Sequence, residues 1–518
     1  MSQITATTGA TVNPKRRWLL LAMALALMVT MIDATMVSIA LPTIQKDLDL
    51  TVIQRSWIIN AYLLALAATI AAAAHLSSRL GHRRIFISGL AIFTIASVLC
   101  GAAINGTMLI IFRAIAGLGA ALIAPTSQAL ITDAFTGKDR GKALGTYTGV
   151  SSAGVILGPI LSGSLTGFFG WQWIFYVNLP LGLAILFLTL YADPPEKLEI
   201  GSFDWAGLAL LVVGLSAVIV ALMQGDDWGY ASLAFVGMLM LGIVSLTLFG
   251  MVEWRIEEPL LALKLFHSRN FLGDSLILFI VRFALFGMAV YTPIFVQEVL
   301  GFTPQLAGLA TLPCTQMLML ISPRTSKIYN QRGIRFVATL SMGVALLGFL
   351  WFALLGFPQQ SYWWMLPAYI LVGGGIALNI TPTLTDLINS VPTEARDRAV
   401  GTISTMQQLG GTFSIAILTT VITPLTYHKF AASLAARGLY ITRKQIQSVL
   451  PTYILTHKLP PGITTQDIQA LKLAFSSALS ISFLIIAALL VVGLIIARTI
   501  LHNTHHEPSD MLIGNAPL

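Results

Sequence analysis

The stretch Trp18–Leu41, WLLLAMALALMVTMIDATMVSIAL, decides the class of fold. Its 24 residues hold one charged side chain, Asp33, and as a helix they would span about 36 Å at 1.5 Å per residue. The hydrocarbon core of a bilayer is about 30 Å thick, so the stretch is long enough to cross it. It is also too long for the apolar core of a signal peptide and lacks a small-residue cleavage pattern. We therefore expect it to be a retained membrane helix.

Similar apolar runs recur along the whole chain. Of its 518 residues 56% are hydrophobic and only 10% are charged, against about 25% charged in soluble proteins. The residue alternation of a membrane β-barrel strand is absent, so helices must satisfy the backbone in the bilayer. The sequence predicts an all-α integral membrane protein with fourteen transmembrane helices, near 18–41, 54–77, 85–104, 108–131, 141–165, 173–191, 205–223, 231–252, 271–297, 305–323, 336–356, 363–387, 398–425 and 473–500.

Lys and Arg residues fall on alternate connections between these runs. This pattern is typical of cytoplasmic connections, and it places the tails 1–17 and 502–518 in the cytoplasm. A long outer loop at about 427–472 also contains basic residues, but long loops cross the membrane with little regard to charge. The net charge of +8 therefore reflects orientation in the cell (inner) membrane, and we expect no nucleic-acid partner.

Few residues carry the chemistry that an enzyme or a channel needs. The two cysteines, Cys100 and Cys314, lie in apolar runs, so neither a disulfide framework nor a metal site is predicted. No nucleotide-binding loop or catalytic constellation is visible, and charged pore rings are absent. We expect neither enzymatic activity nor a cofactor.

The two halves of the chain repeat each other. Arg140–Thr146, RGKALGT, and Arg396–Thr402, RDRAVGT, open two predicted helices, and the connection around Gly81 has a weaker counterpart around Gly333. Same-orientation repeats of this kind build transporters with a central site. We predict an N-terminal six-helix bundle at 18–191, a linker with two additional transmembrane helices at 192–270, and a C-terminal six-helix bundle at 271–501.

Four further stretches are typical of one family. They are Asp33–Pro42 (DATMVSIALP), Leu109–Arg113 (LIIFR) followed by Gly117 and Gly119, the fifth-helix set Gly154, Gly158, Pro159 and Gly163, and Trp171–Pro180 (WQWIFYVNLP). Over nearly its whole length the sequence resembles the fourteen-helix drug:proton antiporters of the major facilitator superfamily, the EmrB/QacA type. The resemblance implies the major facilitator fold, two six-helix bundles plus two extra central helices. It also implies proton-driven export of small lipophilic or amphiphilic compounds by alternating access, as in multidrug efflux and antibiotic resistance.

The resemblance also implies a set of residues for conformational change, namely Gly81, Arg83, Arg84, Gly154, Gly158, Pro159, Gly163 and Gly333. The fifth-helix glycines are expected to pack closely against a second-half helix, where the halves would rock. The sequence departs from the family at Ser78 and Asn330, where the connections usually carry an acid that helps to latch the inward-closed state.

Asp33 and Arg113 are charged residues inside predicted spans, about 12 Å and 9 Å below the outer ends of their helices. Such charges are costly in a bilayer and usually face a cavity or a partner. The hypothesis is that Asp33 alternately binds and releases a proton and that Arg113 controls how tightly the proton is held. The alternatives are a static pair that aids packing and an aspartate shallow enough to be hydrated.

Arg282 lies near the middle of the ninth predicted helix. Guanidinium groups bind carboxylates and phosphates, so Arg282 could contact an anionic substrate. The favoured alternative is an internal partner, either Asp274 on the same helix or Asp33 across the cavity.

A substrate cavity of mixed polarity completes the prediction. Besides Arg282, its expected lining is Asn60, Tyr62, Tyr291, Gln316, Asn379, Gln407, Phe283, Phe286 and Trp57, with Gln297 and Gln408 as further polar groups. Taken one at a time, each is better explained by packing or helix–helix hydrogen bonding.

Other functions stay open at this point. The chain could carry one specific metabolite, lipid or siderophore with protons, or act as a membrane sensor that transports nothing. The expected partners are the lipid bilayer and a small-molecule substrate, with a monomer as the functional unit. If the source has two membranes, a periplasmic adaptor protein could bind the 427–472 loop.

Overall fold

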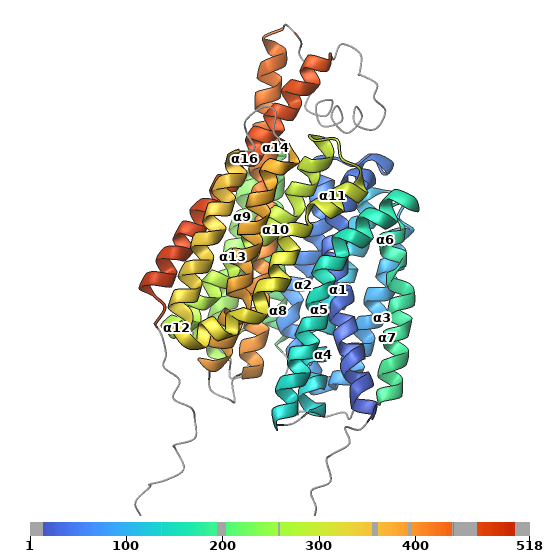
Figure 1. Cartoon of the computed structure of the whole chain (residues 1–518), viewed down its shortest axis with the longest axis vertical. Helices are drawn as coiled ribbons and strands as arrows, with labels where there is room; N and C mark the ends of the chain where they lie inside the picture. The colour runs from blue at the N-terminus through green and yellow to red at the C-terminus, as the bar shows by residue number, and fades with distance from the viewer. Residues whose placement is uncertain are drawn as a thin grey trace, which may run out of the picture.

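The computed structural model describes residues 14–135, 137–193, 204–256, 259–354, 361–391, 396–437, 439 and 464–502. All regular elements in these ranges are helices, so the all-α prediction is confirmed (Figure 1). They are α1 (Pro14–Asp47), α2 (Val52–Leu80), α3 (His82–Gly101), α4 (Gly106–Ala134), α5 (Gly137–Phe168), α6 (Trp173–Tyr176), α7 (Asn178–Ala192), α8 (Trp205–Trp228), α9 (Leu233–Arg255), η1 (Leu263–His267), α10 (Arg269–Glu298), α11 (Pro304–Ala310), α12 (Leu312–Ala353), α13 (Tyr362–Asn389), α14 (Arg396–Ala435) and α16 (Thr465–Thr499).

Twelve helices of the described ranges are long and apolar enough to cross a membrane. The predicted spans 141–165 and 305–323 are not among them. The first lies in α5, which is rich in glycine and hydroxyl side chains, and the second is divided between α11 and α12. The chain is thus a multi-pass membrane protein, while the count of fourteen stays a prediction.

Helices α1 and α14 both continue beyond their expected ends at 41 and 425. Pro42 lies inside α1 and Pro424 inside α14, because membrane helices tolerate proline when neighbouring groups satisfy the freed carbonyl. Asp33 is consequently 14 residues from the end of α1, about 21 Å at 1.5 Å per residue, and not the predicted 12 Å.

The helices pack in two groups with a pair beside them. Helices α1–α7 contact one another, and α10–α16 form the second group. Figure 1 shows these groups side by side, blue to teal and yellow to red. Helix α8 packs against α2 and α14, one helix from each group, and α9 packs on α8. The exact domain boundaries that we gave remain a prediction.

We call the end of the bundle where α1 ends at Asp47 the upper end, and the end where α1 begins at Pro14 the lower end. At the upper end α14 and α16 project together beyond the other helices (Figure 1). Phe430, Leu434 and Ile468 pack between them. The predicted loop 427–472 is therefore helical on both sides, and most of its centre lies outside the described residues.

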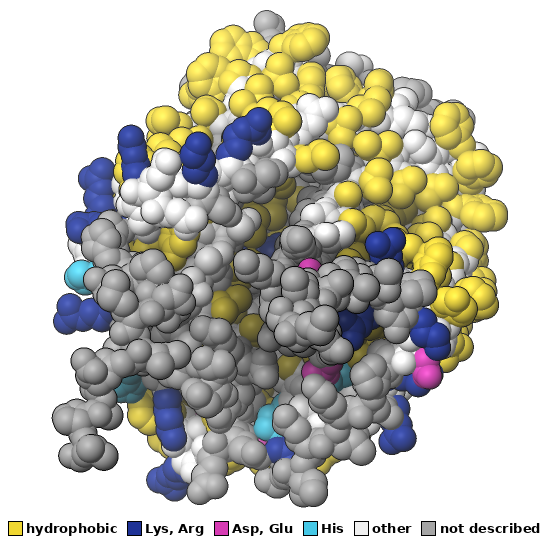
Figure 2. Space-filling model, turned by 60° about the horizontal axis from the view of Figure 1, so that its bottom comes forward, with side chains coloured by type: hydrophobic (Ala, Val, Ile, Leu, Met, Phe, Trp, Pro, Cys, Tyr) yellow, Lys and Arg dark blue, Asp and Glu magenta, His cyan; other side chains and the backbone are white. Residues whose placement is uncertain are grey.

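Lys and Arg side chains gather around the lower face of the molecule, while hydrophobic side chains cover its flank (Figure 2). The flank includes exposed apolar residues of α9, among them Leu233 and Met240. A bilayer around the flank would cover these side chains, and the basic rim agrees with the orientation expected from the charge pattern.

Candidate functional site

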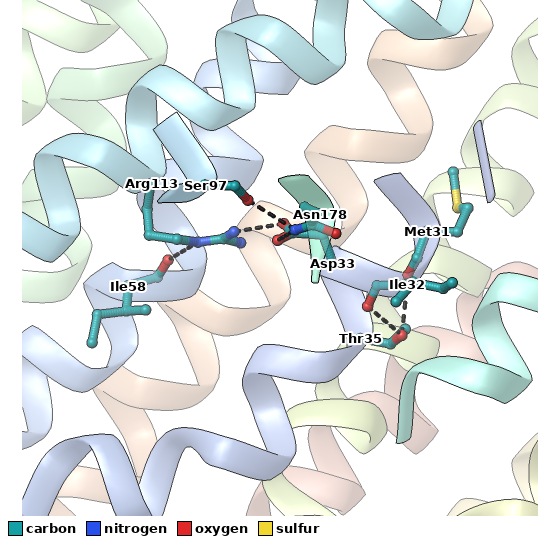
Figure 3. A network of polar contacts seen from close by, with 8 residues as sticks. All are labelled: Met31, Ile32, Asp33, Thr35, Ile58, Ser97, Arg113 and Asn178. Carbon is teal, nitrogen blue, oxygen red and sulfur yellow. Dashed lines mark hydrogen bonds and ion pairs between the residues drawn. The ribbon is translucent and has the colours of Figure 1, made fainter. Parts of the chain in front are cut away.

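The centre of the first helix group contains an ion pair that is closed off from solvent. Arg113 Nη1 of α4 donates a hydrogen bond of 2.6 Å to Asp33 Oδ2 of α1 (Figure 3). Both side chains are 1% exposed. An ion pair this deep is stable only when its remaining hydrogen-bonding groups are also satisfied.

Neighbouring groups provide some of the remaining hydrogen-bond partners of Asp33 and Arg113. Arg113 Nε donates to the carbonyl of Ile58, 3.2 Å away, and the guanidinium carbon lies 4.2 Å from the centre of the Tyr62 ring. Asn178 Nδ2 lies 3.3 Å from Asp33 Oδ1 and 2.8 Å from Ser97 Oγ. Tyr62, predicted to line the substrate cavity, thus belongs to the ion-pair site.

Sequence reasoning missed Asn178 and Ser97 as site residues. The available signal was the position of Asn178, a buried amide that opens the very apolar helix α7 next to Leu179-Pro180. Ser97 lies in an apolar run, where a serine gives no such signal.

Small residues hold α4 close to its neighbours and so position Arg113. A Cβ added to Gly117 would lie 2.4 Å from the carbonyl oxygen of Tyr62, and one added to Gly119 would lie 2.5 Å from the backbone of Phe93. Such close approach requires glycine, as in many membrane helix pairs. It brings the backbone of α2 within reach of Arg113 Nε, one turn from Gly117.

Neither predicted partner of Arg282 is correct. Its Nη2 donates a 2.5 Å hydrogen bond to Gln407 Oε1 of α14, and its buried Nε has no partner among the described residues. Asp33 is engaged by Arg113, and Asp274 lies beside a second carboxyl group. Asp274 lies two turns from Arg282 on α10 and interacts with Asp386 of α13, whereas Arg282 is bound to Gln407 of α14.

Arg282 has aromatic neighbours at the contact of α10 and α14. The ring of Phe279 lies 6.4 Å from that of Phe283 and 6.2 Å from that of Phe413. Phe286 packs on Gly411. The structure thus brings together Arg282, Gln407, Phe283 and Phe286 of the predicted cavity set.

The other predicted cavity residues are dispersed. Asn60 Nδ2 lies 2.9 Å from the sulfur of Met223, and Trp57 packs in the cluster with Leu211 and Leu215, so both face α8 and not a central cavity. Gln316 is exposed on α12, and Asn379 is buried on α13 without a partner for its side-chain amide. Helices that are apolar all round give no indication of which face is central, which explains these errors.

Polar contacts close the upper end between the two groups. Arg55 Nη1 of α2 donates to Glu298 Oε1 of α10 at 2.6 Å and to Gln45 Oε1 at 2.7 Å. Next to them Gln297 Nε2 donates to the carbonyl of Ile39, 3.0 Å away. Both charged side chains are 7% exposed.

Just below this ion pair lies a cavity of about 10 Å³, lined by Leu41, Arg55, Ser56, Val290, Tyr291, Ile294, Thr419, Ile422 and Thr423. A volume of this size holds about one water molecule. Tyr291, a predicted cavity residue, shares a 2.7 Å hydrogen bond with Thr419 there. This cavity between the two groups therefore has no room for a drug-sized compound in this conformation.

The close contacts of the fifth-helix glycines are only partly those predicted. A Cβ on Gly154 would lie 2.5 Å from the carbonyl oxygen of Met28, and one on Gly158 would lie 1.9 Å from Thr35 Oγ1, so both face α1 in the same group. Gly163 faces Pro304 of the second group at 2.7 Å, and Pro159 O lies 2.3 Å from a Cβ on Gly308. Of the predicted fifth-helix positions, Pro159 and Gly163 therefore contact the second group.

The connections at the lower end contain the other residues predicted for conformational change, Gly81, Arg83, Arg84 and Gly333. Gly81 and Gly333 both have positive φ, 98° and 75°. Arg83 Nη1 pairs with Asp193 Oδ1 at 2.5 Å, and His82 Nε2 lies 3.9 Å from Asp133 Oδ2. These acids come from the ends of α7 and α4. In the resembled family the acids are usual at the positions that Ser78 and Asn330 occupy here. Arg84 also has an interaction partner.

Removing the charge of Glu298 should weaken the upper closure. Glu298→Gln leaves Arg55 buried without a counter-charge, and breaking a buried ion pair costs about 3–5 kcal/mol. We expect a Thr423→Cys side chain in the small cavity to react faster with a water-soluble maleimide in the Glu298→Gln background. Asp47→Asn is the control, because Asp47 accepts from Trp171 at the same end within one group. Equal labelling rates of Thr423→Cys with and without Glu298→Gln would show that the ion pair of Arg55 and Glu298 does not hold the upper end closed.

The comparisons with known proteins agree with this architecture. Residues 23–415 match the family described as Major Facilitator Superfamily. The chain belongs to the major facilitator superfamily. This membership makes the chain a membrane transporter of small molecules and not an enzyme, as the sequence predicted.

Several relatives of this superfamily member are named for resistance. Multidrug resistance protein Stp of Mycobacterium tuberculosis (strain CDC 1551 / Oshkosh) is 31% identical over 488 residues, 90% of each chain. Puromycin resistance protein pur8 of Streptomyces alboniger is 33% identical over 437 residues, 82% of this chain and 85% of the relative. These relatives support membership of the drug:proton antiporter family.

A solved structure supports the fold. The superfamily member matches a bacterial homologue of the human lysosomal transporter Spinster, in an inward-facing and unoccupied conformation, with a TM-score of 0.66. The match has 18% identity and covers 95% of this chain and 98% of the other.

Proposed function

We propose that this protein exports small lipophilic or amphiphilic compounds in exchange for protons, by alternating access. One observation carries the proposal, the buried pair of Asp33 and Arg113, because intramembrane charges are costly and are kept for function. The relatives named for multidrug and puromycin resistance support the class of substrate.

Protonation of Asp33 would change the contacts of α1. As a carboxylate Asp33 is held by Arg113 and Asn178. A bound proton removes the negative charge, while Arg113 keeps its contacts with Ile58 and Tyr62. The attraction between α1 and α4 then decreases, so α1 is freer to move.

Helix α1 can carry that change to the upper end. Six residues beyond Asp33, the carbonyl of Ile39 accepts a hydrogen bond from Gln297, whose neighbour Glu298 pairs with Arg55. A shift of α1 would therefore act on the closure between the two groups. In this account the upper end faces outward, and a proton taken up from that side releases the closure so that the compound leaves. The proton is then given up to the inner side, where the next compound binds, which completes the exchange.

The test uses purified protein in liposomes with an imposed pH gradient. Puromycin and the lipophilic cation ethidium serve as substrates. We expect accumulation that depends on the gradient, together with proton movement when substrate is added without one. Accumulation that ignores the gradient would refute proton exchange, and binding without accumulation would indicate a sensor.

A further inference from the structure

The second helix group contains two acids that the proposed exchange does not use. Asp274 lies five residues after the start of α10, and Asp386 lies three residues before the end of α13. Both are therefore at the lower end, and they are 0% and 2% exposed. They are far along the chain from Asp33 and belong to other helices.

The two carboxyl groups interact where α10 packs on α13, because Phe271 and Leu278, on either side of Asp274, share a buried cluster with Leu387, the residue after Asp386. Asp386 Oδ1 accepts a 2.7 Å hydrogen bond from the hydroxyl of Tyr329 on α12. Both oxygens of Asp274 and Oδ2 of Asp386 lack a hydrogen-bond donor within the part of the chain that the structure describes. Among the described residues, no Lys, Arg or His lies within ion-pairing distance of either acid.

The surroundings of the pair are apolar on the other sides. Phe271 and Leu278 of α10, Leu387 of α13, and Ala399 and Ile403 of α14 form one buried cluster there. Among the described side chains, Asp386 and Tyr329 are the titratable groups that interact with Asp274. Arg282 lies two turns away on α10 and is bound to Gln407.

Two ionised carboxylates cannot remain in contact in such surroundings, because each opposes the charge of the other and neither is hydrated. One bound proton removes this repulsion, because the protonated acid then donates a hydrogen bond to the ionised one. We propose that Asp274 and Asp386 form a second proton-binding site, in which one proton is shared between the two carboxyl groups.

Polar side chains extend from this acid pair along α13. Thr383 lies three residues before Asp386, and Asn379 lies four residues before Thr383, so all three are on one face of the helix. Both are 0% exposed, and their side-chain polar atoms lack partners. They supply hydrogen-bonding groups between the acid pair and the middle of the bundle, as a proton or water molecules would need.

Infrared spectroscopy of the purified protein tests the site directly. A protonated carboxylic acid has a C=O stretching band separate from that of carboxylates. We expect wild type at neutral pH to show this band and Asp274→Asn, in which the amide donates to an ionised Asp386, to lose the part that belongs to the pair. Asp49→Asn, which removes an exposed acid at a turn of the upper end, should leave it unchanged. Absence of the band from wild type would overturn the proposal.

Thermal unfolding across pH provides a second, independent measurement. If the folded protein holds a proton that the unfolded chain releases, stability falls as the pH rises. In Asp274→Asn the amide can donate to Asp386 permanently, so this variant should fold and lose less stability toward alkaline pH. An equal pH dependence in both proteins would contradict the shared proton. Stabilisation of wild type by Na⁺ but not K⁺, absent from Asp274→Asn, would assign the site to a metal ion and overturn it as well.

This site does not depend on the proposed export. Infrared bands and unfolding are measured without substrate, so failure of Asp33 in transport would leave the acid pair unaffected. If both proposals hold, each helix group contains one proton-binding position, Asp33 in the first group and Asp274 with Asp386 in the second.

Discussion

Asp33→Asn should abolish export driven by a pH gradient while preserving the folded protein. Asparagine has nearly the same size and can still accept a hydrogen bond from Arg113, but it cannot take up a proton. We expect accumulation of ethidium in liposomes under a pH gradient to fall to the level of liposomes without protein. Downhill movement of the compound, which needs no coupling, should remain measurable.

The matched control is Asp193→Asn. It also removes one aspartate paired with an arginine, but this pair lies at the lower end with side chains that are 28% and 60% exposed. Its export should stay close to wild type. Gradient-driven export that persists in Asp33→Asn would reject the coupling role and leave the ion pair as a packing element.

The second large effect concerns stability. Arg113→Leu leaves the Asp33 carboxylate buried with Asn178 as its remaining side-chain donor among the described residues. Loss of one partner from a buried ion pair costs about 3–5 kcal/mol, because the other charge stays in a medium that solvates it poorly. We expect a large decrease in the unfolding temperature, measured in lipid nanodiscs.

A double variant separates charge from packing. Asp33→Asn with Arg113→Leu contains no buried charge at this position, so it should regain much of the stability that Arg113→Leu loses. Its gradient-driven export should still be absent. Arg83→Leu, at the exposed pair with Asp193, should cost less than about 1 kcal/mol. If the double variant is no more stable than Arg113→Leu, the loss reflects packing of the long side chain.

The sequence alone predicted the features that depend on length and on rare residues. Apolar runs gave the helices, and a lone charge in such a run, Asp33 or Arg113, identified the buried pair. The rotation of each helix about its axis could not be predicted. In a water-soluble protein the polar face of a helix indicates its outside, but here both the lipid and the protein interior are apolar.

The errors follow from this physical limit. Asn60 was expected at the centre and faces Met223 of α8. For Arg282 an internal partner was favoured over substrate, with Asp274 and Asp33 as the candidates, and the partner is Gln407. Asp386 was overlooked because its significance arises only when α13 lies beside Asp274 of α10. Contacts between distant helices of this kind require the packed structure.

The positive φ angles at Gly81 and Gly333 indicate the history of the molecule. With ψ angles of 128° and 172°, both residues occupy a backbone region that is essentially restricted to glycine. The two positions are 252 residues apart; Gly81 joins α2 to α3, and Gly333 lies at a kink that divides α12 into two helices. The same unusual backbone conformation at corresponding positions of both halves is explained by duplication of an ancestral gene segment. Selection against any side chain would have preserved both corners after the surrounding sequences diverged.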